Sequence, residues 1–270
     1  MIQRVIFSAS TPAVYVEADR LRMSPHGHLE FERTRELLRR ELPPAPARVL
    51  DVGGGTGVHA QWLARDGDRV HLVDVVEGHV EQAALVRGVT ASVGDARHLE
   101  QPTGGANVVL LLGPLYHLID AADRAAALGE ASRVVRPGGL VVVAAISRYA
   151  GLLDLATLGR LDAPTEQLLH ETIQTGVHDP RLGFTIAHFT ALRNSPKSSP
   201  TPARLTSTCS VWRDRSDRPW ICTVWEHFDE FLPSALACAR VLERDPALQA
   251  ASAHLLAFGR ATGRELPPPQ

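Results

Sequence analysis

Glycine residues that could contact a ligand through their main chain are concentrated in the stretch VLDVGGGTGVHAQWLARDGDRVHLVD, residues 49–74. Gly53, Gly55 and Gly57 follow an apolar run with the spacing GxGxG, and a helical pattern begins directly after them. A loop of this kind presents main-chain amides to a ligand, because glycine has no side chain to hold the ligand away. Gly55, Gly57 and Ala60 also fit the dinucleotide spacing GxGxxA, so the loop alone does not decide between ligands.

Carboxylates follow the next two apolar runs. Asp74 ends the second run, 17 residues after Gly57, where a carboxylate can accept hydrogen bonds from both hydroxyls of an adenosine ribose. Asp95, preceded by Gly94, ends the third run. Because parallel strands carry their ligands at their carboxyl ends, we expect the glycine loop and both carboxylates at one edge of a sheet.

Short apolar runs alternate with helical patterns between residues 47 and 147. This alternation predicts a Rossmann-like α/β fold, with a doubly wound, mostly parallel sheet and helices on both faces. The expected strands cover residues 48–53, 69–76, 91–95, 106–113 and 140–147, and the expected helices cover residues 59–67, 78–88 and 123–139.

The segments outside this core are less regular. Residues 1–46 form an N-terminal arm that includes an amphipathic helix over residues 29–42, and residues 148–190 begin with two helical patterns that are expected to cover a substrate region. Residues 234–270 contain a closing helix, 234–242, and a closing strand, 254–261.

Residues 191–233 break the pattern, with a Ser/Thr/Pro-rich composition and no helical or strand period. A linker, a family-specific insertion or a pair of compensating frameshifts would each produce such a change. We expect residues 194–219 to lack regular helix, to pack poorly and to supply no site residues. If the substrate wall normally comes from this segment, the protein is expected to bind its ligand and to turn over weakly or not at all.

The composition and net charge limit the classes of molecule that this protein is expected to bind. The formal net charge of −2 gives no strong field for nucleic acid or anionic lipid, and we interpret the basic tract at residues 193–218 as a solvated loop. The three cysteines fit neither a redox pair nor a zinc site, so no metal is expected. The longest apolar stretch, residues 108–119, is shorter than the roughly 20 residues that span a bilayer. Without a recognisable signal peptide, the expected location is cytoplasmic and the expected partner is a small molecule.

Taken in order, these motifs resemble those of the class I S-adenosylmethionine-dependent methyltransferases. VLDVGGGTG resembles the first motif, VHLVD the second and VGDARHL the third, while NVVLLLGPLYHL and RVVRPGGLVVVAAIS are similar to the fourth strand and to the turn before the fifth. The resemblance covers residues 47–147 and implies S-adenosylmethionine as cofactor. It implies these donor-site residues: Asp51, Gly53, Gly54, Gly55 and Gly57 at the methionine part, Asp74 and Val75 at the ribose, Gly94, Asp95 and Ala96 at the adenine, and Leu112 and Gly113 beside the sulfonium.

The resemblance also suggests which residues take part in the reaction. Methyl transfer needs mainly alignment of donor and acceptor, so an acid or base is optional. His117 follows the fourth strand and could take an acceptor's proton, which typically contributes roughly 10²–10⁴-fold, and Tyr116 could pack on the acceptor. Tyr15 and Arg20 match the N-terminal lid of small-molecule members, and a small aromatic, quinone-like or polyketide-like acceptor is expected by analogy.

Two other functions stay open at this point. An NAD-dependent oxidoreductase shares the sheet and the acid at the second strand, although it has no standard use for Asp51 or for Gly94 and Asp95. A non-catalytic protein that binds an adenosyl ligand would carry the same motifs. Oligomeric state leaves no signal in this sequence.

Overall fold

The structure is a computed structural model of the 270-residue chain. It describes residues 21, 25–157, 159–191, 204–208, 228–243, 245–249 and 252–261. Tyr15 and Arg20, the expected lid residues, lie outside this part of the chain.

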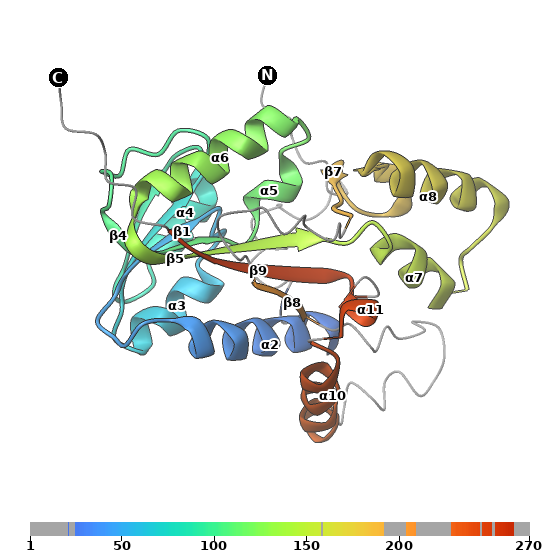
Figure 1. The fold of residues 1–270 in the computed structure, drawn as a ribbon, viewed down its shortest axis with the longest axis horizontal. Helices are drawn as coiled ribbons and strands as arrows, with labels where there is room; N and C mark the ends of the chain where they lie inside the picture. Colours follow the sequence, from blue (N-terminus) through green and yellow to red (C-terminus); the bar gives the residue numbers. More distant parts are fainter. Residues whose placement is uncertain are drawn as a thin grey trace.

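A seven-stranded sheet with the order β3-β2-β1-β4-β5-β9-β8 forms the centre of the fold (Figure 1). The first five strands run parallel, β9 is antiparallel to β5, and β8 is antiparallel to β9. The strand order reverses between β1 and β4, and at such a point the loops after the two strands diverge and leave a crevice for a ligand. The strands are β1 Arg48–Val52, β2 Arg69–Asp74, β3 Val89–Val93, β4 Ala106–Leu111, β5 Val135–Ile146, β8 Arg204–Thr208 and β9 His254–Arg260.

Helices cover both faces, as the mostly parallel sheet requires (Figure 1). Successive residues of β1 show why: Val49 packs into the cluster under α2 and α3, and Leu50 packs into the cluster under α6. Both side chains are about 2% exposed, which explains why the strands are apolar throughout. The helices that cover the two faces are α2 Pro25–Glu41, α3 Val58–Arg65, α4 Glu77–Ala84, α5 Pro114–His117 and α6 Ala121–Val134.

A smaller group of elements follows β5 and projects beside the sheet (Figure 1). The two helices expected after the fifth strand are present as α7 and α8, and a two-stranded sheet of β6 and β7 lies next to them. In chain order these elements are α7 Ala150–Thr157, α8 Ala163–Thr175, β6 Val177–His178, the 3-10 turn η1 Pro180–Leu182 and β7 Ala187–His188. The chain then supplies α10 Phe228–Leu242 and α11 Pro246–Gln249 before β9.

The segment expected to be irregular is partly ordered. Within this segment the structure describes a strand, Arg204–Thr208, which pairs with β9 along its whole length. An edge strand is held by one neighbour through its main chain, so it needs little of the apolar pattern that marks a buried strand. The closing helix also begins earlier than expected, at Phe228. The rest of residues 194–219 lies outside the described residues.

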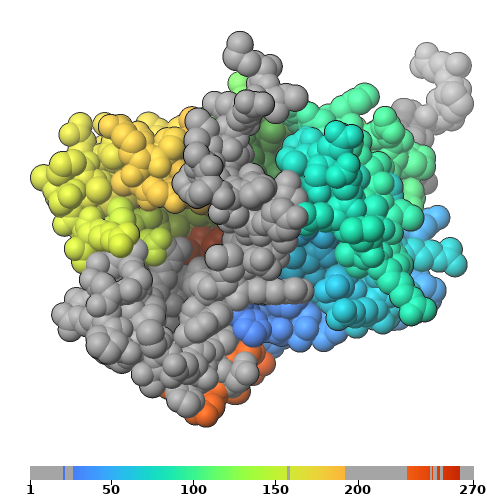
Figure 2. Space-filling view, turned by 180° about the vertical axis from the view of Figure 1, so that it is seen from behind, coloured from blue at the N-terminus to red at the C-terminus, as the bar shows by residue number. Residues whose placement is uncertain are grey.

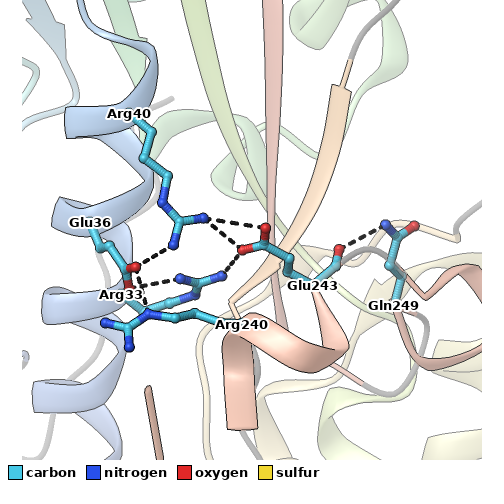
Figure 3. A network of polar contacts seen from close by, with 6 residues as sticks. All are labelled: Arg33, Glu36, Arg40, Arg240, Glu243 and Gln249. Atoms are coloured by element: carbon cyan, nitrogen blue, oxygen red, sulfur yellow. Dashed lines mark hydrogen bonds and ion pairs between the residues drawn. The ribbon is translucent and has the colours of Figure 1, made fainter. Parts of the chain in front are cut away.

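An ion-pair network joins α10 to α2 (Figure 3). Arg33 of α2 is fully buried and donates to the carboxylates of Glu36 and Glu243. Arg40 also donates to Glu243, at 3.0 Å, and Arg240 of α10 donates to Glu36, at 2.7 Å. Although burial raises the pKa of Glu36, hydrogen bonds from Arg240, Arg33 and Arg40 lower it to about 2. The network therefore links two segments that are about 200 residues apart in the sequence.

Within the described ranges, no helix is long and apolar enough to cross a membrane. The same residues contain no group of three or more His, Cys, Asp or Glu side chains that could hold a metal ion.

Candidate active site

The glycine loop between β1 and α3 lies at the carboxyl edge of the sheet. Gly53, Gly55 and Gly57 have φ values of 67°, 58° and 88°, in the left-handed region that favours glycine. A Cβ on Gly53 would lie 2.7 Å from the Pro114 ring, and a Cβ on Gly54 would lie 2.6 Å from the Leu72 side chain. The loop can follow this path only without side chains at these positions.

Asp51 lies beneath this loop, near the end of β1. Its side chain is buried, with 1% exposure, and no donor in the described part of the chain reaches its Oδ2 atom. Burial, with a smaller contribution from the charge of Asp74, raises the pKa of Asp51 to about 7. Buried polar atoms are almost always paired, so this oxygen is prepared to accept a hydrogen bond from a group that the chain does not supply.

Asp74 is also buried, but both of its oxygens are held. Oδ2 accepts from the Gly55 N–H at 2.9 Å, while Oδ1 accepts from the Val76 N–H at 2.9 Å and lies 3.2 Å from His79 Nδ1. Burial raises the pKa of Asp74, and the hydrogen bonds from His79, Val76 and Gly55 outweigh it and lower the pKa. The carboxylate is therefore ionised and fixed against the glycine loop.

The sequence motifs did not single out His79, which stands five residues after Asp74 in the first turn of α4. The spacing of five residues is the one feature of the sequence that could have indicated His79. It places an imidazole at the start of a helix next to the carboxylate at the end of the preceding strand. Val75, beside Asp74, is 64% exposed and adds an apolar surface at the same edge.

The end of β3 adjoins Asp74. The Gly94 N–H donates to the Asp74 carbonyl at 3.0 Å, and a Cβ on Gly94 would lie 2.7 Å from the Val73 side chain. Asp95 is paired with Arg97, whose hydrogen bonds lower the pKa of the Asp95 carboxyl. Ala96, the next residue, is buried. The three residues predicted at this strand end thus lie where they were expected, with Asp95 already bound to an arginine.

The end of β4 touches the glycine loop from the other side. A Cβ on Gly113, the residue after Leu112, would lie 3.0 Å from the Gly53 carbonyl and 3.7 Å from the Tyr116 hydroxyl. Tyr116 therefore reaches back to the strand end, whereas His117, on the same short helix, is exposed. Of the two predicted catalytic residues, Tyr116 is the one whose functional group lies at the sheet edge.

The fold and these contacts can be compared with known proteins. A family model described as a methyltransferase domain matches residues 49–139, from β1 to the turn within β5. This region is a class I S-adenosylmethionine-dependent methyltransferase domain. The match favours a methyltransferase over the oxidoreductase alternative, and S-adenosylmethionine is the cofactor of such domains.

Curated relatives match this methyltransferase domain and its flanks. The chain is 32% identical over 125 residues to a ubiquinone biosynthesis O-methyltransferase of Maricaulis maris, covering 44% of this chain and 48% of the relative. It is 33% identical over 107 residues to the ubiquinone/menaquinone biosynthesis C-methyltransferase UbiE of Acidiphilium cryptum. This match covers 36% of this chain and 42% of the relative. The chain thus spans less than half the length of each of these relatives.

Solved structures extend the likeness in fold to most of the chain. An S-adenosylmethionine-dependent methyltransferase from Mesorhizobium loti has a TM-score of 0.54 at 17% identity and covers 86% of this chain and 99% of its own. A chain from a Haloferax volcanii complex that contains the Trm112 methyltransferase activator has a TM-score of 0.54 at 16% identity and covers 94% and 97%. At these identities the likeness concerns the fold alone.

The residues present fit S-adenosylmethionine. The glycine loop keeps its main chain free of side chains, since a Cβ at Gly53 would clash with Pro114 and a Cβ at Gly54 with Leu72. The unpaired Asp51 oxygen suits a hydrogen-bond donor such as an amino group. The ionised Asp74 suits a hydroxyl donor, because its Oδ2 accepts one hydrogen bond, from Gly55, and a carboxylate oxygen can accept a second.

Proposed function

We propose that this protein transfers the methyl group of S-adenosylmethionine to a small-molecule acceptor by in-line displacement. The observation that carries the proposal is the convergence of strand ends on the glycine loop. Gly55 is bonded to Asp74, Gly113 lies against Gly53, and the unpaired Asp51 oxygen lies beneath the loop. This is the arrangement needed to hold an adenosyl group and a methionyl group along one edge of the sheet.

We assign the donor-binding roles by position. Asp51 would accept a hydrogen bond from the donor's amino group, and the loop from Gly53 to Gly57 would line the methionine part. Asp74 would accept the ribose hydroxyls, and the exposed Val75, with Asp95 and Ala96, would border the adenine. Leu112 and Gly113 would lie beside the reacting methyl group.

When bound, S-adenosylmethionine supplies a methyl group that is already activated on a positively charged sulfur. The chain's own task is therefore to hold the acceptor in line and to exclude water. Tyr116 is placed to contact the acceptor, since its hydroxyl lies against the end of β4. The exposed His117 would lie at the rim of the site.

The relatives support an organic acceptor of modest size. Their names describe O- and C-methylation in ubiquinone biosynthesis. The net charge of −2 offers no general attraction to nucleic acid or to anionic lipid, so neither is proposed as a partner.

Calorimetric titration tests the donor site. S-adenosylhomocysteine should bind saturably to the unmutated protein, and Asp74→Ala should weaken its binding roughly 10–100-fold, because hydrogen bonds to a charged group contribute about 1.5–3 kcal/mol. Glu166→Gln, an exposed carboxylate on α8, is the matched control and should bind like the unmutated protein. Saturable binding of NADH without binding of S-adenosylhomocysteine would refute the proposal. Donor binding without methyl release to any small-molecule extract would indicate the non-catalytic alternative.

A further inference from the structure

An aromatic cluster lies beyond the carboxyl end of β5, among α5, β6 and β7. It consists of Tyr116, His178, Phe184 and Phe189. The His178 ring stacks on Phe189 with centroids 4.5 Å apart and 20° between planes, and Phe184 meets it edge-on at 6.0 Å. Tyr116 joins the cluster through Phe184, at 6.5 Å. These rings form an apolar wall with an imidazole in it.

His178 is the unusual member of the aromatic cluster. Its side chain is 2% exposed, and neither ring nitrogen has a hydrogen-bond partner among the residues that the structure describes. Burial lowers the pKa of His178, so the ring is neutral near neutral pH and carries one N–H donor and one acceptor nitrogen. Leaving both unpaired costs free energy that a phenylalanine at this position would not incur. Such a group is expected where a ligand completes its hydrogen bonds.

The aromatic cluster is adjacent to the place assigned to the reacting methyl group. The Tyr116 hydroxyl lies 3.7 Å from the Cβ position of Gly113, directly after β4. On the other side, the Thr190 N–H donates to the Ile146 carbonyl at 2.7 Å, which fastens the segment after β7 to the end of β5. Figure 1 shows α5 and β7 gathered at that end of the sheet. The aromatic cluster thus extends from the donor edge to His178.

One ring of the aromatic cluster reaches the surface. Phe184 is 39% exposed, while Phe189 and His178 are buried. A flat molecule that displaces the Phe184 ring would stack between aromatic side chains and reach the imidazole. Aromatic rings prefer offset or edge-on contact with one another, which selects a planar guest.

We propose that the aromatic cluster is the acceptor site, that it takes a planar aromatic hydroxyl compound, and that His178 binds the hydroxyl and receives its proton. This inference rests on the proposed methyl transfer. The acceptor oxygen forms a bond to the methyl carbon while the carbon–sulfur bond breaks and leaves its electron pair on sulfur. The hydroxyl proton passes to the unprotonated nitrogen of His178, which returns it to solvent after the product leaves.

Binding of catechol to the purified protein tests the proposal. The titration is followed by calorimetry with and without S-adenosylhomocysteine, and 1,2-dimethoxybenzene serves as the ligand without hydroxyls. We expect His178→Phe, which keeps a ring but removes both nitrogens, to weaken catechol roughly 5–50-fold and to abolish its preference over 1,2-dimethoxybenzene. His170→Phe, an exposed histidine on α8, should behave like the unmutated protein.

Different results would refute the proposed methyl transfer and the proposed acceptor site. If S-adenosylhomocysteine does not bind, the proposed function fails, and the catechol titration without it still reports on the aromatic cluster. If S-adenosylhomocysteine binds but catechol does not, or binds equally to His178→Phe, the acceptor site is refuted. Should His178→Phe not fold, nitrogen-15 shifts of the His178 ring in the unmutated protein replace it. A shift on adding catechol supports the proposal, and no shift overturns it.

Discussion

Two buried carboxylates at one sheet edge show how local hydrogen bonding decides the charge of a residue. Asp51 and Asp74 are both almost inaccessible to water, yet the pKa of Asp51 is raised to about 7 and that of Asp74 is lowered. The difference lies in their partners. Asp74 accepts hydrogen bonds from Gly55 and Val76, whereas Oδ2 of Asp51 has no partner within the described part of the chain.

Donor binding should therefore release a proton from Asp51. Below about pH 7 this carboxyl is largely protonated in the ligand-free protein, and pairing with the positively charged amino group of S-adenosylhomocysteine favours its ionised form. Affinity should rise with pH up to about 7 and then level off. Calorimetry at about pH 6 in buffers of different ionisation enthalpy measures the proton release directly. Asp51→Asn should abolish it and Asp66→Asn should not; an unchanged release in Asp51→Asn would show that another group titrates.

At the scale of elements, the glycine loop connects β1 to α3 while contacting the residues after β4. Glycine is required in this loop for two reasons: some positions have left-handed backbone, and others have no space for a Cβ atom. Gly54 lacks a positive φ, but a Cβ there would lie 2.7 Å from Asp51 Oδ2 and 2.6 Å from Leu72 Cδ1.

Gly54→Ala is expected to displace the loop and to weaken S-adenosylhomocysteine at least about tenfold, with a loss of about 1–3 kcal/mol in the free energy of unfolding from overpacking. Gly129→Ala is the matched control, because nothing lies within 4 Å of a Cβ on Gly129 in α6. That variant should leave donor binding unchanged and gain up to about 1 kcal/mol from helix propensity. Equal donor affinity in Gly54→Ala would show that the loop adapts without cost.

The network between α2 and α10 gives a second prediction for elements. Arg33→Met would leave Glu243 buried with less compensation, and we expect the free energy of unfolding to fall by about 3–5 kcal/mol. Arg181→Met removes an exposed ion pair with Asp179, which solvent screens, and should change the free energy of unfolding far less. Urea unfolding near neutral pH measures both. A loss in Arg33→Met no larger than in Arg181→Met would mean that the Arg33 pair adds nothing to stability.

For the whole molecule, the sheet and its helical layers account for the buried core. The two large clusters of buried side chains in the described structure draw on α2 and on elements that follow it. The space-filling view shows the coloured surface of these elements from behind (Figure 2).

We expect that deletion of residues 1–20 leaves the thermal transition in place, because the sheet and its helices bury two large apolar clusters among the described residues. If the expected lid residues Tyr15 and Arg20 contact the donor, the same deletion should weaken S-adenosylhomocysteine several-fold, by the loss of about 1 kcal/mol or more of hydrogen bonding. Calorimetric scanning and titration of the shortened protein measure the two effects separately. Loss of the whole transition would show that the arm is structural, and unchanged affinity would remove both residues from the donor site.

The sequence by itself determined the parallel sheet, its helical cover and the sheet edge at which the glycine loop, Asp74 and Asp95 lie. These features leave local signals: apolar runs of strand length, glycine spacing after the first strand, and Asp74 and Asp95 at strand ends. The sequence contains no sign of strand β8 in the segment after residue 190, because an edge strand needs little apolar pattern.

Tertiary structure alone decided which side chains meet. It brought the Tyr116 hydroxyl, and not His117, to Gly113, and it left Oδ2 of Asp51 unpaired while binding both oxygens of Asp74. It also placed His178 between the rings of Phe184 and Phe189, which flank β7, and Arg33 against Glu243. Such pairs join residues that are distant in the chain, and their distances depend on how whole elements pack, which no local periodicity encodes.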